Sequence, residues 1–468
     1  MCRAPVWTIF MKTRITNVWF NLSSSYWFVP ALLGFAAVGL SYGVYAVDVY
    51  LRENDVSSVW WLYGGGISGA RTILTSMATS LVTIASVVFS ISLLVLSTTL
   101  SQYGPLLIRN FMHDRASQVT FGIFVATFIY CYLMLNLLKG QQVDYMPGLS
   151  VTVGILLGIV SVGVLVYFIH HMAASIQSDN VIATVGKDFE KTIARLYPES
   201  KKNNNRRPTN KVDPSVPPDF DQHASPVLAA QAGYLQAVDT QHLLHIAGEN
   251  DLILRLGFRP GLFVNEQHAL ALVWPGERKD ERICREIRQG FIFGTERTLE
   301  QDVEFAVNQI IEIAVRALSP SLNDPFIALT CVDWLGVGLM KMAESDIPSP
   351  YHYDKSGKLR IIAHPLDFVE LTGEMFTKLR QYANLNVATT IRLLEVIQEI
   401  GGTVQREPDR VALLKHALML ERGSRALQMQ QWERKCVEEK FRLAVRALMK
   451  DAGPPAYDSY RKRNYEGR

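Results

Sequence analysis

Hydroxyl-bearing side chains recur at helical spacing in the apolar segment between residues 72 and 101. Steps of three, four or seven residues separate them, so an α-helix places them along one stripe. No charged residue interrupts the stripe, and the opposite face carries lipid-compatible residues such as Leu81, Val88, Leu94 and Val95. The stripe consists of Thr72, Ser76, Thr79, Thr83, Ser86, Ser90, Ser97 and Ser101.

Two functions fit such a stripe. Hydroxyl oxygens replace part of an ion's hydration shell without the cost of an isolated buried charge, which is typical of a helix that lines a pore. In that case Leu93 and Leu94 form a hydrophobic gate that closes by dewetting, and the helix must surround the axis of a homo-oligomer. Alternatively, small hydroxyl residues let membrane helices pack closely, and they bond to one another or to their own i−4 carbonyls without any pore. Packing is also the expected role of Gly34, Gly39, Gly43, Gly154, Gly158 and Ser161.

His170 and His171 are candidates for a pH-sensitive gate, because imidazole titrates near neutral pH. They lie at the expected cytoplasmic end of an apolar segment. The alternative is a solvated pair with no role in gating.

A polar turn between residues 316 and 328 is a candidate binding site for a small anion. It contains Arg316, Ser319, Asn323 and Asp324. Free N–H groups at the start of the following helix would receive the anion, with help from Arg316. The alternative is a rigid corner between two helices in which the Asn and Asp side chains only cap.

Motifs for catalysis or cofactor binding do not occur in the sequence. We find no Ser-His-Asp order, GxSxG, HExxH, Walker loop or Gly-rich nucleotide fingerprint. The five cysteines are scattered without a CxxC pair, which suggests neither disulfides nor a zinc site. We therefore expect no enzyme activity, no metal and no cofactor. The net charge of +3 gives no reason to expect nucleic acid as a partner.

Four stretches without Asp, Glu, Lys or Arg predict the elements that position these residues. A hydrocarbon core about 30 Å thick needs roughly 20 apolar residues, and we expect transmembrane helices near 27–49, 72–101, 118–138 and 148–172. The predicted spans lack a carboxylate at membrane depth, which weakens an interpretation as a proton- or sodium-coupled transporter.

Basic residues gather beside these spans and predict the topology. They include Lys12 and Arg14 before the first span, Arg109 and Arg115 between the second and third, and seven Lys or Arg in 187–207. The positive-inside rule places both termini of a multi-pass protein of the lipid bilayer in the cytoplasm.

The remainder of the chain is too polar for a bilayer and predicts a cytoplasmic mixed α/β domain, mainly helical with a small β unit. Thr298–Gln301 matches a capping box, Pro320 ends the helix that it opens, and Asp324 with Pro325 begins the next helix. In chain order the expected parts are a cytoplasmic N-terminal segment with interfacial aromatic residues (1–26), a four-helix transmembrane domain (27–174), a helical stalk (175–198), a polar linker (199–226), a small β-rich unit (227–297) and a helical domain (298–468) with a hairpin near 349–363.

Several runs of this sequence carry a family resemblance. They include VVFSISLLVLSTTLSQYGPLLIRNFMHDRASQ, EQDVEFAVNQIIEIAVRALSPSLNDPFIALTCVDWL and SPYHYD. With them the chain resembles the bacterial predicted membrane proteins called domain of unknown function 2254, over nearly its whole length from about Met11. The resemblance implies a protein of the bacterial inner membrane, and it implies no activity. The residues before Met11 depart from the pattern, which leaves Met11 as an alternative start to Met1.

Together these features predict an oligomeric channel or pore-like transport protein of the inner membrane, with the second span lining the path of a small ion. The alternative is a non-conducting membrane scaffold or signalling protein whose cytoplasmic domain binds a partner or a small anionic ligand.

Overall fold

The chain folds into two compact units, residues 1–180 and 181–468. The structure, a computed structural model, describes residues 27–53, 62–105, 115–139, 148–175, 177–198, 216–383, 386–425 and 429–449. The predicted N-terminal segment 1–26, with both alternative start residues, and positions 199–215 of the predicted linker lie outside the described residues.

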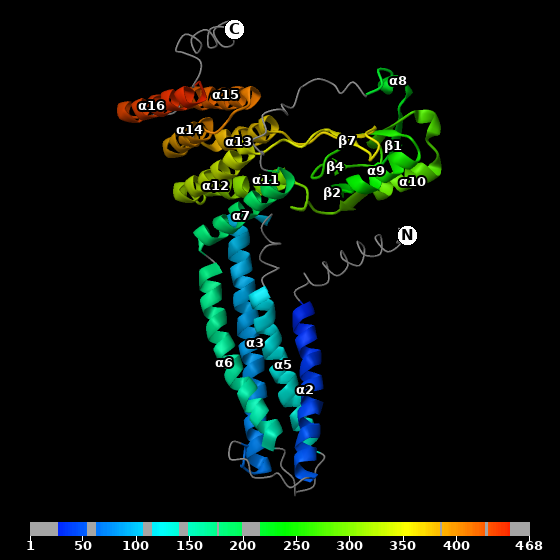
Figure 1. Cartoon of the computed structure of the whole chain (residues 1–468). Helices are drawn as coiled ribbons and strands as arrows, with labels where there is room; N and C mark the ends of the chain where they lie inside the picture. The colour runs from blue at the N-terminus through cyan, green and yellow to red at the C-terminus, as the bar shows by residue number, and fades with distance from the viewer. Residues whose placement is uncertain are drawn as a thin grey trace. The chain divides into compact units, whose positions relative to one another are not determined.

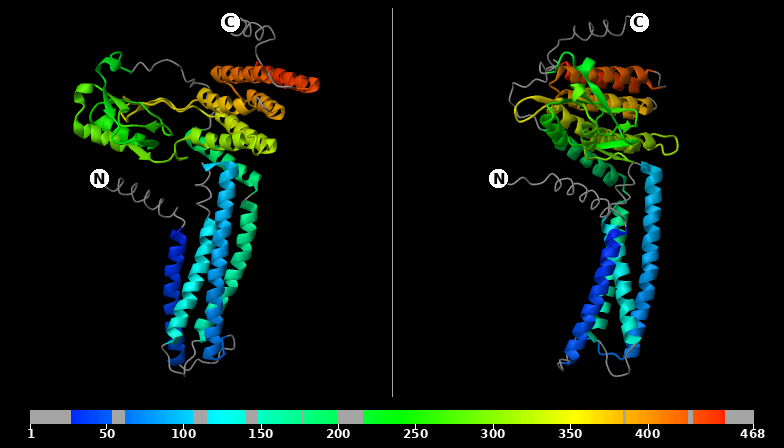
Figure 2. Two further views of the ribbon diagram at one scale, coloured as in Figure 1. Left: turned by 180° about the vertical axis from the view of Figure 1, so that it is seen from behind. Right: turned by 90° about the vertical axis from the view of Figure 1, so that its right-hand side faces the viewer.

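The first unit is built from four long helices that run side by side (Figures 1 and 2). α5 packs against each of the other three helices, and α6 also contacts α2 and α3. Each predicted span coincides with one of these helices or falls within it. They are α2 (Phe28–Glu53), α3 (Ile67–Tyr103), α5 (Arg115–Lys139) and α6 (Gly148–Ser175).

Five helices of the described chain, rather than the expected four, are long and apolar enough to cross a membrane. The fifth is α12 (Pro325–Glu344), which contains Asp333, Lys341 and Glu344 and was therefore missed by a search for charge-free stretches. Half of its apolar window is buried inside the protein, against 17–39% for the other four helices. Because α12 packs against α11 and α14, a protein core accounts for its apolar composition.

A buried carboxylate ties α2 to the beginning of α6. The Asp48 carboxylate accepts hydrogen bonds from the backbone N–H groups of Leu149 (3.2 Å) and Ser150 (2.7 Å) and from the Ser150 hydroxyl (2.6 Å). These N–H groups belong to the first turn of α6, where a negative charge is favoured by the helix dipole. The expectation that the spans lack a carboxylate is therefore wrong for α2, which continues to Glu53 and includes Asp48.

Two more hydrogen bonds join all four helices at this end of the unit. The Tyr130 hydroxyl of α5 donates to the Ser150 carbonyl of α6 (2.8 Å), and Arg71 of α3 donates to the Leu138 carbonyl of α5 (2.6 Å). We call these residues, with Asp48 and Leu149, the Asp48 junction. The junction satisfies polar groups that a bilayer would leave without partners.

Small residues of α6 allow close contact with its neighbours. A Cβ on Gly154 would lie 3.0 Å from Leu74 Cδ2, and one on Gly158 would overlap Met77 Cε. The Ser161 hydroxyl lies 3.2 Å from that of Thr127. Packing thus explains these residues.

The glycines of α2 differ in this respect. A Cβ on Gly34 would lie 3.2 Å from the Ile129 side chain, whereas Gly39 and Gly43 meet no atom of the described chain within 4 Å. Packing within the described chain therefore does not explain Gly39 and Gly43, and their expected role in packing stays a prediction.

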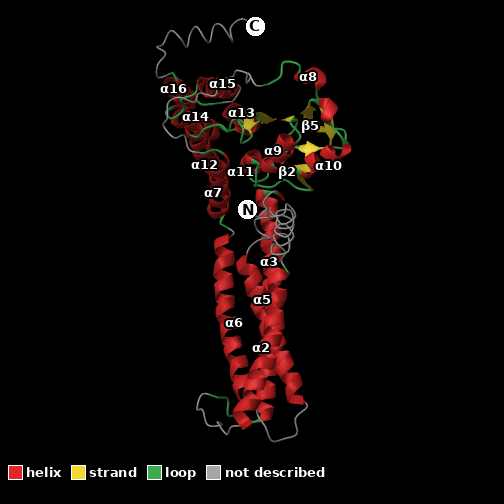
Figure 3. Ribbon diagram, turned by 45° about the vertical axis from the view of Figure 1, so that its right-hand side comes forward, coloured by secondary structure: helices red, strands yellow, loops and turns green. Residues whose placement is uncertain are grey.

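All strands of the described chain belong to the second unit and form two sheets (Figure 3). The five-stranded sheet has the order β1-β5-β3-β8-β7, and the three-stranded sheet has the order β4-β2-β6. α9 (Thr240–Glu249) and α10 (Glu281–Gln289) contribute buried residues to the core of the β unit. The strands are β1 (Ser225–Leu228), β2 (Gly233–Val238), β3 (Ile253–Leu256), β4 (Phe263–Val264), β5 (Ala269–Trp274), β6 (Phe291–Gly294), β7 (Tyr351–Tyr353) and β8 (Leu359–Ile362).

The β unit extends beyond the expected range 227–297. β7 and β8 form an antiparallel hairpin, and β8 pairs in parallel with β3, with Ile361 opposite Leu254. Both of these side chains are fully buried, so the hairpin completes the core. Phe220, in α8 (Phe220–His223), is also buried, which ends the polar linker earlier than residue 226.

The helical part of the second unit begins with a cap that differs from the predicted one. Asp302 caps α11, because its Oδ1 accepts the Phe305 N–H (2.9 Å). Arg297 holds the Asp302 carboxylate with bonds of 2.7 and 2.9 Å. The capping box at Thr298–Gln301 is therefore wrong. The helices are α11 (Val303–Ala317), α12, α13 (Phe368–Ala383), α14 (Val387–Gly401), α15 (Glu407–Ser424) and α16 (Gln431–Leu448).

The predicted stalk is a separate helix that packs against α12. α7 (Ser178–Leu196) begins after α6 ends at Ser175. A Cβ on Gly338 would overlap the Phe189 ring, and one on Gly186 would overlap the Trp334 ring. Phe189 is fully buried, so the apolar face of α7 belongs to a core, and the expectation of a stalk that continues the fourth span is wrong.

We predict that Asp48→Asn destabilises the first unit, because the amide replaces a charge-assisted acceptor with a group that carries its own N–H donors. The free energy of unfolding should fall by about 2 kcal/mol, which thermal unfolding in detergent measures. Asp179→Asn is the control, since Asp179 is exposed in the first turn of α7. Equal shifts for both variants would show that the junction contributes nothing.

Candidate functional site: the hydroxyl face of α3

Every predicted residue of the α3 stripe is exposed. At 100° per residue the eight hydroxyl side chains occupy a sector of about 80°. The opposite side of α3 is buried, through residues that include Leu74, Leu81, Val88 and Val95. Leu81, Val88 and Val95 lie on the face opposite the stripe, as expected, and they belong to an apolar cluster that α3 shares with α5 and α6.

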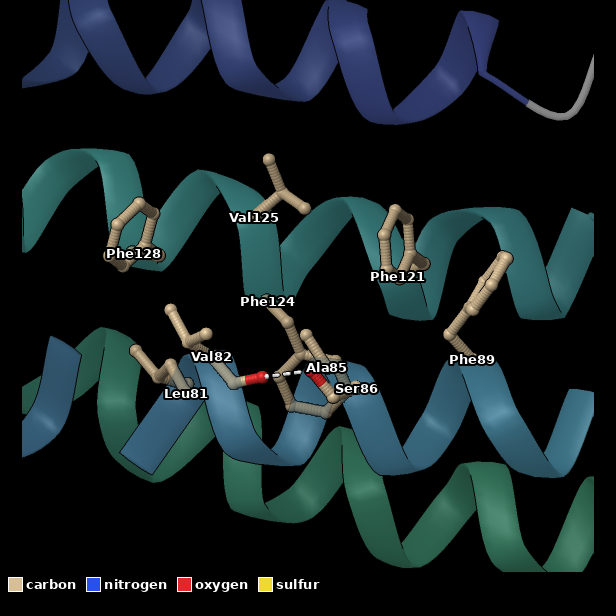
Figure 4. A pocket seen from close by; sticks show the side chains of 9 residues that line it. All are labelled: Leu81, Val82, Ala85, Ser86, Phe89, Phe121, Phe124, Val125 and Phe128. Atoms are coloured by element: carbon tan, nitrogen blue, oxygen red, sulfur yellow. Dashed lines mark hydrogen bonds between the residues drawn. The ribbon is translucent and has the colours of Figure 1, made fainter. Parts of the chain in front are cut away.

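Most hydroxyls of the stripe donate to the carbonyl four residues earlier. The distances are 2.9 Å for Thr72, 3.0 Å for Thr79, 3.1 Å for Thr83, 3.0 Å for Ser86 and 2.8 Å for Ser90. Figure 4 shows the bond from Ser86 to the Val82 carbonyl. A hydroxyl that donates its hydrogen in this way retains oxygen lone pairs as acceptors. The stripe thus presents acceptors outward.

These contacts separate the two functions considered for the stripe. The hydroxyls bond to their own helix, as the packing interpretation expects. They do not, however, fill space between helices of this chain, because α3 packs through its opposite side. The outward side of α3 is available to lipid, water or another subunit.

Leu93 and Leu94 interrupt the stripe between Ser90 and Ser97. Their side chains are 50% and 67% exposed, so both project from the unit on the side of the hydroxyls. Leu94 was expected on the opposite face, and its exposure corrects that placement. The pair forms an apolar segment within a polar sector, and its role as a gate stays a prediction.

Sequence reasoning missed three members of this face, one of which is the exposed Ser68 in the first turn of α3. Thr75 and Ser80 are also exposed and flank the stripe on either side. Thr75 lies three residues after Thr72, so helical spacing would have included it.

An apolar groove of about 290 Å³ borders the stripe, between α3 and α5. Figure 4 shows phenylalanine side chains from both helices along it, with Ser86 among the lining residues. The rings of Phe89 and Phe121 lie 6.1 Å apart. The outward side of this helix pair therefore combines a hydroxyl sector with an aromatic one.

The two histidines lie near the end of α6. His170 is exposed, and the ring of His171 stacks on Tyr167 at 5.8 Å. A role in pH sensing stays a prediction.

The structure brings the predicted anion-binding residues together in one turn between α11 and α12. Arg316 forms an ion pair with Glu312 (3.2 Å), and the Ser319 hydroxyl donates to the Arg316 carbonyl (2.6 Å). The Asp324 carboxylate accepts from two N–H groups in the first turn of α12, and Asn323 adopts a φ of 46°. Because the charged groups and the N–H donors already have partners, the geometry favours the rigid corner.

Among the described residues, no group of three or more His, Cys, Asp or Glu side chains is placed to hold a metal ion. The family model described as "Predicted membrane protein (DUF2254)" matches residues 23–399. The chain belongs to this family. The match includes all of α3 and the turn after α11.

Curated relatives of this family member are mycobacterial proteins. The chain is 28% identical over 414 residues to an uncharacterized protein of Mycobacterium tuberculosis, which covers 86% of this chain and 77% of that protein. An uncharacterized protein of Mycobacterium bovis gives the same values. No solved structure matches.

We predict that Thr83→Val changes the free energy of unfolding of the monomer by less than about 0.5 kcal/mol, because the exposed hydroxyl packs against nothing within the chain. Leu81→Ala should cost about 2–5 kcal/mol, since Leu81 is buried and its loss leaves a cavity. Thermal unfolding of detergent-dispersed monomer compares the two variants. Equal losses would mean that the stripe stabilises the fold of the single chain.

Proposed function

We propose that this membrane protein is an oligomeric channel in which α3 of each subunit lines the pathway. The observation that supports the proposal is the concentration of eight exposed hydroxyl residues in one sector of a helix whose other side is buried. Lipid gains nothing from such a sector, whereas water and ions interact with it favourably. Association around α3 would turn the outward sector of each monomer into the wall of a pore.

The chemistry of the stripe favours small cations as the conducted species. Five hydroxyl groups in 72–90 donate their hydrogens to backbone carbonyls. The outward-facing atoms are therefore oxygen acceptors, which can replace water around a cation and repel an anion. No charged residue lies between Arg71 and Tyr103 of α3, so the selectivity is expected to be modest.

The proposed location is the bacterial inner membrane, with both termini in the cytoplasm. The support is the excess of Lys and Arg beside the ends of the helices that the positive-inside rule assigns to the cytoplasm. Four helices then cross the bilayer, and α12 stays in the core of a cytoplasmic vestibule or sensor. Enzyme activity forms no part of the proposal, because the sequence carries no catalytic motif.

A non-conducting scaffold or signalling protein is the second candidate. It is favoured by the same hydrogen bonds to i−4 carbonyls, because a hydroxyl satisfied by its own helix tolerates lipid without any pore. The two functions differ in one property, which is whether water reaches the stripe.

We predict that channels carrying Ser86→Cys or Ser90→Cys lose conductance when treated with a cationic methanethiosulfonate reagent. The reagent reacts with thiolates that water reaches, and the added bulk and charge obstruct cations. Recordings of the purified protein in planar bilayers measure the change. Ile159→Cys is the control, because Ile159 is 64% exposed on α6 and lies outside the hydroxyl stripe of α3.

Two results would contradict a channel whose pathway is lined by α3. One is a silent bilayer across voltage, tension and pH, and the other is an equal effect of the reagent on Ile159→Cys. The first result would favour the scaffold, and the second would place the pathway elsewhere on the helices.

The pair Leu93→Ser and Leu94→Ser should raise the conductance or the open probability, because hydroxyls keep a narrow apolar segment wet. Single-channel recording provides the measurement, with Val166→Ser on the exposed side of α6 as the control. Unchanged currents would exclude these leucines as the gate and leave the pathway itself unaffected.

A further inference from the structure

A groove of about 710 Å³ lies between α13 and α15 in the second unit. Its volume is in the range of sites that hold small organic molecules. Val369, Val411 and Met419 provide apolar walls, and Arg380, Lys415 and His416 provide positive or polar groups. The groove therefore combines an apolar surface with cationic groups, as a site for an amphiphilic anion requires.

Arg380 is the unusual member of this set. It is half-buried, its Nε is enclosed without a hydrogen-bond partner, and it forms no ion pair with any described residue. Other shielded arginines of this unit are paired, such as Arg360 with Asp354 (2.7 Å). Enclosing a cation without a counter-charge costs free energy that a bound anion would recover.

His416 of α15 supplies a second unpartnered nitrogen among the residues that line the groove. The residue is 6% exposed, its ring stacks on Phe376 at 5.0 Å, and its Nδ1 has no hydrogen-bond partner. Burial lowers the pKa of His416 to about 4, and the positive charges of Lys415 and Arg380 add to the effect. The imidazole is therefore neutral at pH 7, where it offers one N–H donor and one acceptor.

The charge of the groove is positive despite one carboxylate on its wall. Glu407 opens α15, but its side chain is 77% exposed and lies 4.0 Å from Arg410. Arg380 and Lys415 make no ion pair with it or with any other described carboxylate. The two cations thus remain available to a ligand.

We propose that this groove binds a small organic anion, with its carboxylate or phosphate group against Arg380, Lys415 and His416 and its apolar part along Val369, Val411 and Met419. The site is separate from the proposed pathway along α3, and it holds whether or not the protein conducts ions. It also differs from the turn after α11, where Arg316 and the helix N–H groups already have partners.

Titration calorimetry on the full-length protein in detergent micelles tests the site, with phenyl phosphate as the probe. Wild-type protein should bind it saturably, and inorganic phosphate and phenol should each bind more weakly, because each fills half of the groove. Arg380→Gln should weaken binding about tenfold or more through the loss of a charge-assisted contact. His416→Phe should also weaken it while keeping the stacked ring. Arg442→Gln is the matched control, since Arg442 is 78% exposed on α16.

A second measurement separates a binding residue from a structural one. Without ligand, Arg380→Gln should leave the melting temperature unchanged or raise it, because it removes an unpaired cation. A purely structural arginine would lower it. The proposal is wrong if wild-type protein shows no saturable binding of phenyl phosphate, if Arg380→Gln binds as tightly as wild type, or if Arg380→Gln lowers the melting temperature.

Discussion

A polar group in hydrocarbon must find its partner within the protein, and the four-helix unit meets this constraint in two ways. At one end, the Asp48 carboxylate accepts hydrogen bonds from the backbone N–H groups in the first turn of α6. The charge and the helix terminus thus serve as partners for each other. Along α3, side-chain hydroxyls donate to backbone carbonyls of the same helix and need no partner on another helix. The first solution joins helices. The hydrogen bonds within α3 leave a polar sector free to face outward, and the proposed function therefore depends on what contacts the outward side of α3.

In the second unit, ion pairs provide partners for charged groups that are shielded from water. Arg259 follows β3 and reaches Glu304 of α11 (2.6 Å) and Glu370 of α13 (2.9 Å), so one guanidinium joins the β unit to two helices. Burial by itself lowers the pKa of Arg259. The negative charges of Glu304 and Glu370 outweigh this effect, so the pKa of Arg259 is raised. Against this background of paired charges, Arg380 stands out because it has no partner among the described residues. The other half-buried or buried arginines of this unit form ion pairs, so Arg380 indicates a site where one arginine is left unpaired.

Features that depend on local periodicity were predictable from the sequence. The four apolar helices, the capping of α12 by Asp324 and the β7–β8 hairpin follow from spacing and turn residues within a few positions. The orientation of the α3 stripe could not be predicted, because it depends on which face of α3 is covered by α5 and α6. The groove between α13 and α15 could not be predicted either, because it brings Arg380 next to residues some 35 positions later in the sequence. The pairing of Leu254 with Ile361 likewise joins strands that no local pattern relates.

The unequal lengths of the four helices connect the protein to the thickness of its membrane. α3 has 37 residues and is about 55 Å long, whereas α5, with 25 residues, is about 38 Å long. A hydrocarbon core is about 30 Å thick, so a longer helix must tilt or protrude more than its shorter neighbours. With a core of this thickness the mismatch is largest for α3. The helix that carries the hydroxyl sector is thus the one of the four that extends farthest beyond such a core.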